Sequence, residues 1–153
     1  MAELHPLLKN DCLLVGKFEL CKLLLMKDAN YPWFILVPDR DGITEIYQLD
    51  DAAQQQLMRE SSVMARLLVE HFQADKVNIA ALGNVVPQLH VHHIARYHED
   101  PAWPAPVWGT CPAQAYTGEA LQLTRDKTLL ALRGEAGFVA LGQGESGGLE
   151  SAC

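Results

Sequence analysis

Residues 83–96 read GNVVPQLHVHHIAR. Three histidines fall here within four positions, in a stretch that otherwise reads as a buried strand. An imidazole in such a strand needs hydrogen-bond partners wherever water is excluded. Side chains on a strand alternate between its two faces. One face therefore carries the row Gln88, His90, His92, Ile94 and Arg96, and the other carries Leu89, Val91, His93 and Ala95.

The segments around this strand predict an α+β fold: an antiparallel sheet of about five strands with one long helix and a C-terminal helix. Apolar runs at 20–26 and 33–38 predict strands that pair antiparallel across the turn signal DANYP at 28–32. Residues 76–82 predict another strand, which a turn at Gly83-Asn84 joins to the histidine strand as a hairpin.

Helices are expected at 50–73 and 118–134. In the first, apolar residues recur at three- to four-residue steps or twice that, and Asp50 and Asp51 suit a helix N-terminus. Residues 97–112 are rich in proline and tryptophan and predict irregular structure. We therefore expect a single domain over residues 1–138, followed by a disordered Gly/Ser-rich tail at 139–153.

Composition narrows the classes of partner. The net charge of −7 opposes binding to nucleic acid or to an anionic membrane, but it does not exclude a small anionic ligand in a suitable pocket. The sequence shows neither a transmembrane run nor a secretory signal. Its four cysteines lack zinc-ligand or C-x-x-C spacing, so reduced thiols and a cytoplasmic location are expected.

The row of polar side chains has three interpretations. Two histidines at i and i+2 can chelate a metal, but zinc needs at least three protein ligands and no acidic or cysteine partner stands at a suggestive spacing. The histidines can also be satisfied polar groups within a sheet. The third interpretation is nucleophilic catalysis, in which a neutral imidazole attacks phosphorus and later leaves, while the strand fixes the spacing of its neighbours.

GNVVPQLHVHHIAR resembles the signature of the histidine-triad (HIT) superfamily, in which His-x-His-x-His is followed by two apolar residues. The similarity covers roughly residues 15–110 and includes YPWFILVP, the long helix and NIAALGN. The chain looks especially like a bacterial branch of HIT-type diadenosine tetraphosphate hydrolases, which carry PQLHVH and a following WP-x-PVWG. Here that second element is WPAPVWG at 103–109.

The resemblance implies that His90 is the nucleophile toward the α-phosphorus of a nucleotide, and that His92 hydrogen-bonds the phosphate or the leaving-group oxygen. Gln88 replaces the first histidine of the triad and cannot deliver a titrating proton near neutral pH. It can still bind substrate or support the adjacent imidazole.

The segment before the histidines supplies further candidates for nucleotide binding. Val85 stands where relatives often have a hydroxyl residue near the α-phosphate. Backbone amides from Gly83 through Val86 can still form a cradle for phosphate oxygens. Asn84 either adds a side-chain donor to that cradle or serves only the turn.

Four more residues are candidates for the nucleotide site: Asp28, Asn30, Arg96 and Trp108. Asp28 and Asn30, just before YPW, stand where the family places an acceptor for ribose hydroxyls, although both are also good turn residues. Arg96 either meets a distal phosphate or is a solvated strand-end cation. Trp108 either covers or stacks in the site, completes a dimer surface, or packs structurally.

The implied ligand is a purine nucleotide or a dinucleoside polyphosphate. No redox cofactor and no metal held by protein residues are expected, although a divalent ion can accompany the polyphosphate. A homodimer is implied by the resemblance alone. Two alternatives stay open: a nucleotide-binding or regulatory HIT protein with little turnover, and a protein that binds metal through its histidines.

Overall fold

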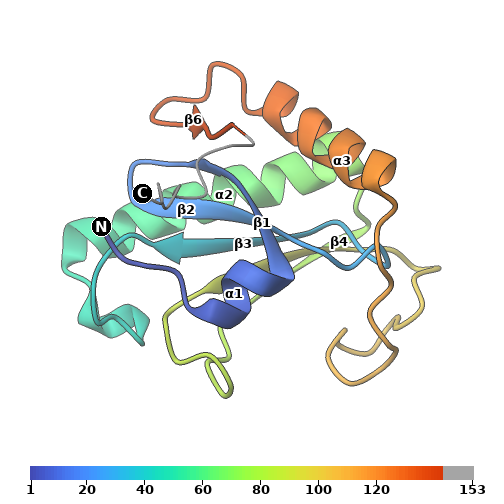
Figure 1. The fold of residues 1–153 in the computed structure, drawn as a ribbon, viewed down its shortest axis with the longest axis horizontal. Helices are drawn as coiled ribbons and strands as arrows, with labels where there is room; N and C mark the ends of the chain where they lie inside the picture. Colours follow the sequence, from blue (N-terminus) through green and yellow to red (C-terminus); the bar gives the residue numbers. More distant parts are fainter. Residues whose placement is uncertain (143–153) are drawn as a thin grey trace, which may run out of the picture.

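Six strands form one antiparallel sheet in the order β4-β5-β3-β2-β1-β6 (Figure 1). The computed structural model describes residues 1–142. The strands are β1 Cys12–Lys17, β2 Cys21–Met26, β3 Trp33–Pro38, β4 Lys76–Ala80, β5 Val91–Arg96 and β6 Val139–Ala140. The antiparallel pairs β2–β3 and β4–β5 confirm the pairings expected from the sequence.

Three α-helices accompany the sheet: α1 Pro6–Asp11, α2 Asp51–Phe72 and α3 Gly118–Ala131, with a 3₁₀ turn, η1, at Ile46–Gln48. The long helix begins where its sequence predicts, because the Asp50 carboxylate accepts a hydrogen bond of 2.8 Å from the Ala53 amide. None of the helices within residues 1–142 is long and apolar enough to span a membrane. The expected α+β fold with a long helix and a C-terminal helix is confirmed.

The sheet is covered on both faces, which gives two cores. On one face, Phe34 and Leu36 of β3 pack with Met64 and Leu68 of α2. The opposite core joins Trp33, Ile35 and Val37 of β3 and Ile94 of β5 to α1 and to the segment after β5. In Figure 1, α2 passes behind the sheet and α1 lies in front of it. Alternation along β3 and β5 therefore sends neighbouring side chains into different cores, as the sequence pattern predicts.

Some boundaries differ from the expectations. The strands β1 and β6 were not predicted, because β1 follows directly on α1 without a turn signal and β6 has two residues. The predicted tail begins too early, since Val139–Ala140 pair with β1. Residues 143–153 of that tail lie outside the described residues.

Gly16 makes the pairing with β6 possible. It lies at an irregularity in the β1–β2 register and pairs with Ala140. A Cβ at this position would lie 2.4 Å from Phe138 Cζ and 2.7 Å from the Val139 carbonyl oxygen. The second contact is with backbone, so a change of rotamer cannot relieve both clashes.

We therefore expect Gly16→Ala to lower the free energy of unfolding by about 1–3 kcal/mol, the usual cost of overpacking. Urea denaturation measures this change. Gly118→Ala is the control, because a Cβ at Gly118 meets nothing within 4 Å. Equal stability of the two variants would contradict the assigned role of Gly16.

Candidate active site

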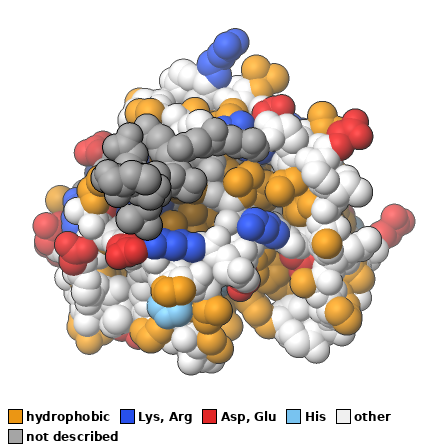
Figure 2. Space-filling model, viewed as in Figure 1, with side chains coloured by type: hydrophobic (Ala, Val, Ile, Leu, Met, Phe, Trp, Pro, Cys, Tyr) orange, Lys and Arg blue, Asp and Glu red, His pale blue; other side chains and the backbone are white. Residues whose placement is uncertain are grey.

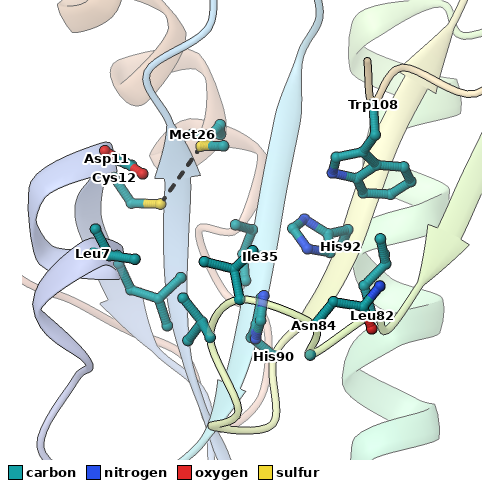
Figure 3. A pocket seen from close by; sticks show the side chains of 14 residues that line it. Leu7, Asp11, Cys12, Met26, Ile35, Leu82, Asn84, His90, His92 and Trp108 are labelled. Atoms are coloured by element: carbon teal, nitrogen blue, oxygen red, sulfur yellow. Dashed lines mark hydrogen bonds between the residues drawn. The ribbon is translucent and has the colours of Figure 1, made fainter.

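A cavity of about 240 Å³ opens between α1 and the start of β5, on the sheet face opposite α2. Figure 2 shows hydrophobic side chains gathered around and beside α1 on this side of the molecule. The lining residues are Leu7, Leu8, Asp11, Cys12, Met26, Ile35, Leu82, Gly83, Asn84, Val85, Val86, His90, His92 and Trp108. In Figure 3 the two histidines lie on one side of the cavity, and Leu7, Asp11 and Cys12 lie on the other.

His90 lies immediately before β5 and is held by the backbone. Its Nδ1 lies 2.7 Å from the carbonyl oxygen of Gln88. A carbonyl oxygen only accepts, so Nδ1 carries the proton in this hydrogen bond and the Nε2 lone pair stays available. The backbone thereby fixes the tautomer of His90 that a nucleophile at Nε2 requires.

His92, the second residue of β5, has the opposite tautomer. The indole Nε1 of Trp33 donates to His92 Nδ1 over 2.9 Å, and an indole N–H can only donate. The neutral ring of His92 therefore carries its proton on Nε2. Protonating Nδ1 would set two donors against each other, so this hydrogen bond stabilises the neutral ring.

The environment of His92 also opposes a positive charge. Its side chain is buried, and the ring centroids of His90 and His92 are 4.9 Å apart. Burial, followed by the repulsion from His90 and His93, lowers the pKa of His92 to about 3. The pair thus combines an imidazole whose Nε2 is the unprotonated nitrogen of its neutral tautomer with an N–H donor that is uncharged at neutral pH.

His93 points to the other face of β5, as the alternation predicts. Its Nδ1 lies 3.1 Å from the Val91 carbonyl, and its Nε2 lies 2.7 Å from Ser61 Oγ on α2. Because the Val91 carbonyl takes the Nδ1 proton, the Ser61 hydroxyl donates to Nε2. Burial lowers the pKa of His93 to about 4. The predicted structural placement of this histidine is confirmed.

The segment after β5 brings Trp108 to the cavity. Its ring centroid lies 5.1 Å from that of His92 and 5.7 Å from that of Trp33, both in edge-on geometry. Arg96 holds this segment: its guanidinium makes hydrogen bonds of 2.8 and 3.0 Å to Asp100 and one of 2.8 Å to the Ala105 carbonyl.

Seven of the predicted site residues line this same cavity: Gly83, Asn84, Val85, Val86, His90, His92 and Trp108. The expected turn at Gly83-Asn84 is in fact part of a longer loop, because β4 ends at Ala80 and β5 begins at Val91, and this loop places Asn84 and Val85 at the cavity. Val85 is 78% exposed, so its side chain presents an apolar surface at the opening.

The other four predicted residues, Gln88, Asp28, Asn30 and Arg96, are not among the described residues that line the cavity. The Asp28 carboxylate accepts hydrogen bonds from the amides of Asn30 and Gln114, and the Asn30 side chain donates to the Pro112 carbonyl. The expectation of a solvated Arg96 is wrong, because its side chain is 1% exposed and ion-paired with Asp100.

Sequence reasoning missed Trp33 and the residues from α1. Trp33 reads as one apolar member of a buried strand, and only its pairing with Ile94 brings it beside His92. Asp11 is the one carboxylate among the described lining residues. Cys12 lies 3.8 Å from the Met26 sulfur, and burial raises the pKa of its thiol to about 12, so it lines the cavity as a neutral group.

Cys12, Cys21 and Cys111 are free thiols, and Cys153 lies outside the described residues. Within residues 1–142, no group of three or more His, Cys, Asp or Glu side chains is arranged to hold a metal ion.

An antiparallel sheet with a long helix on one face and paired histidines at a cavity on the other defines a protein of the histidine-triad class. The HIT domain model matches residues 8–99, more than half of the chain. The chain belongs to this family, whose members are nucleotide hydrolases and transferases.

Solved histidine-triad proteins share the fold closely. One from Marinobacter aquaeolei is 49% identical, with 87% of this chain and 97% of that chain covered and a TM-score of 0.84. One from Bradyrhizobium japonicum is 48% identical over 84% and 96% of the two chains, with a TM-score of 0.82. One from Sinorhizobium meliloti is 40% identical over 85% and 96%, also with a TM-score of 0.82. A search of curated proteins found no match.

The tautomer of His92 can be observed directly. We expect nitrogen NMR at neutral pH to show its proton on Nε2, because Trp33 occupies Nδ1 as a donor. Trp33→Phe removes that donor and is expected to let the proton of the neutral ring move to Nδ1, while burial keeps the pKa of His92 low. Trp103→Phe is the control, because its ring contacts His98 instead. A proton on Nδ1 of His92 in the wild type would refute the tautomer assignment.

Stability is expected to fall with acid before the carboxylates titrate. His92 and His93 have folded-state pKa values of about 3 and 4, below the value near 6.5 of an unfolded chain. Their contribution is complete above about pH 6.5 and is lost as pH falls toward those folded values, at up to about 1.4 kcal/mol per pH unit for each histidine. Urea denaturation between about pH 6.5 and 5 measures the slope. A flat profile would contradict it.

Proposed function

We propose that this HIT protein is a nucleotidyl hydrolase or transferase that acts on the α-phosphate of a nucleoside polyphosphate or nucleoside phosphoramidate. The reaction passes through a nucleotide covalently bound to His90. Diadenosine tetraphosphate represents the first substrate class and adenosine 5′-phosphoramidate the second. The motifs PQLHVH and WPAPVWG support the diadenosine tetraphosphate hydrolase-like branch of the family.

The complementary tautomers of His90 and His92 are the observation that carries this proposal. His90 has an Nε2 lone pair because its Nδ1 proton points to the Gln88 carbonyl, and His92 has an Nε2 proton because Trp33 donates to its Nδ1. A nucleophile and a neutral donor thus stand next to each other, at one cavity with the backbone of residues 83–86. Phosphoryl transfer needs a nucleophile together with donors for the phosphate oxygens.

In the first step, His90 Nε2 forms a bond to the α-phosphorus, and the bond from phosphorus to the leaving-group oxygen or nitrogen breaks. The ring of His90 becomes cationic, and its Nδ1 proton remains directed at the Gln88 carbonyl, whose dipole stabilises that charge. His92 Nε2–H donates to a phosphate oxygen. Water then attacks phosphorus and loses a proton to solvent, His90 leaves with the electron pair of the P–N bond, and the nucleoside monophosphate is released.

The leaving group decides how well this site works. A neutral imidazole with a pKa of about 3 does not supply a ready proton at neutral pH. General acid catalysis is typically worth roughly 10²–10⁴-fold, so a substrate that needs it is disadvantaged. A nucleoside polyphosphate leaves as an anion without first taking a proton, whereas an amine must be protonated from solvent. The electrostatics of His92 therefore favour phosphoanhydrides over phosphoramidates.

A binding protein with little turnover is the second candidate function. It is favoured by the side chain of Gln88, which bonds to the backbone of Glu3 and His5 in place of a titrating group beside His90. Retained nucleotide affinity without release of product would support it. The purine preference, the homodimer and the cytoplasmic location remain predictions from the sequence.

The test incubates wild type and His90→Ala with each substrate and measures AMP release, with mass spectrometry of the intact protein after an acid-free quench. We expect wild type to release AMP, faster from diadenosine tetraphosphate, and to carry a nucleotidyl adduct. His90→Ala is expected to lose both, because the substitution removes the proposed nucleophile.

His98→Ala is the matched control, because its imidazole lies outside the cavity beside Asp75 and Trp103. An adduct that persists in His90→Ala would refute the proposed nucleophile. Binding of AMP by wild type without any turnover would select the binding function instead.

A further inference from the structure

Gln88 occupies the first position of the Gln-x-His-x-His row, but its carboxamide is turned toward the N-terminal segment. The side-chain oxygen accepts a hydrogen bond of 2.8 Å from the His5 amide, and the side-chain nitrogen donates one of 3.0 Å to the Glu3 carbonyl. One side chain thus pairs with two backbone groups that are two residues apart, much as a neighbouring strand would.

The N-terminal segment is also held by hydrogen bonds at Ala2. The Ala2 amide donates to Asp39 Oδ1 over 2.6 Å, and Lys22 donates to the Ala2 carbonyl. Asp39 also bonds to Lys17 at 2.6 Å and to Lys22 at 3.2 Å. These hydrogen bonds at Ala2 and at residues 3–5 hold the segment that leads into α1, whose N-cap is His5 with its Nδ1 accepting from the Leu7 amide.

Helix α1 forms the side of the cavity that faces the histidines. Leu7, Leu8 and Asp11 line the cavity, and Leu8 is also packed into the core on this face of the sheet. Figure 3 shows Leu7 and Asp11 across the space from His90 and His92. Apolar side chains can pack against a base, and the Asp11 carboxylate can accept from hydroxyl groups.

We propose that Gln88 is a positioning residue for substrate binding: by holding residues 3–5 it fixes α1 as the wall that recognises the nucleoside half of the substrate. This inference rests on the proposed function. It assigns Gln88 an effect on affinity and none on the chemical step, in which the backbone carbonyl of residue 88, but not its side chain, takes part.

A carboxamide suits this task better than the imidazole found at this position in the triad. Its N–H and C=O groups point the same way, so both can meet one edge of a peptide segment. The two ring nitrogens of an imidazole point apart. A carboxylate has the size of the carboxamide but can only accept, so it keeps the bond to His5 and faces the Glu3 carbonyl without a donor.

The test compares wild type, Gln88→Ala and Gln88→Glu by hydrogen exchange and by kinetics with diadenosine tetraphosphate. We expect faster exchange of amides 3–11 in both variants, most in Gln88→Ala, with unchanged exchange in β5 and α2. KM should rise about tenfold in Gln88→Ala and less in Gln88→Glu, as expected for the loss of two hydrogen bonds or one, while kcat stays near wild type.

Gln54→Ala is the control. Its carboxamide also bonds to a backbone carbonyl, that of Leu49 at 2.8 Å, but lies outside the cavity lining. It should change neither the exchange of amides 3–11 nor KM. If Gln88→Ala alone proves too unstable, Gln88→Glu carries the comparison, because it preserves the size of the side chain.

Several outcomes would overturn the proposal. Unchanged exchange of amides 3–11 would show that Gln88 does not hold the segment, and faster exchange with unchanged KM would show that the segment does not set affinity. A fall in kcat at constant KM would place the side chain of Gln88 in the chemical step. If wild type neither binds AMP nor turns over, the proposed function fails and so does the effect on affinity, while the exchange data still report separately on the contact with residues 3–5.

Discussion

Burial of β5 on both faces is the constraint on which the site depends. Every residue of this strand is buried, and so is His90 immediately before it, so the imidazole nitrogens that face the protein need hydrogen-bond partners. The partners differ in kind: a carbonyl for His90, an indole N–H for His92, and a carbonyl with a hydroxyl for His93. Packing demands alone thus determine which nitrogen carries each proton. The reactive arrangement of the pair follows from satisfying a buried strand.

The sequence predicted those features that follow from local pattern. Alternation separated His92 from His93, and the spacing of apolar residues located α2, because a buried strand and an amphipathic helix impose fixed periods. Contacts between distant residues escaped it. The Gln88 side chain is hydrogen-bonded to the backbone of His5 and Glu3, which lie 83 and 85 positions away in the sequence. Asp28 accepts from the Gln114 amide, 86 positions away. No local pattern reports such pairs, so the sequence could not predict that these side chains make hydrogen bonds to the backbone of distant segments.

The burial of Arg96 is another feature that local sequence pattern does not predict, and it involves a larger free energy. A strand-end arginine is ordinarily solvated, but here the segment from Asp100 to Ala105 folds back over it. The buried guanidinium is compensated by Asp100, and by the Asn78 side chain at 2.8 Å. Breaking such a pair leaves an uncompensated buried charge, which typically costs about 3–5 kcal/mol. The position of Trp108 beside His92 therefore depends on a charge pair that never touches the cavity.

The two sides of the cavity come from parts of the chain under different constraints. The histidine side is fixed by β3 and β5, where a change to one partner alters a tautomer and therefore the chemistry. The opposite side comes from α1, a short helix that runs directly into β1, packs Leu8 into the core and follows a segment held by hydrogen bonds at residues 2–5. Leu7 and Asp11 belong to that helix, whereas the hydrogen bonds that set the two tautomers come from Trp33 and from the Gln88 carbonyl. Substitutions in α1 can therefore change nucleoside recognition while the pair His90 and His92 stays intact. Gln88 connects the two sides of the cavity, because its backbone carbonyl orients His90 and its side chain binds the segment that leads into α1.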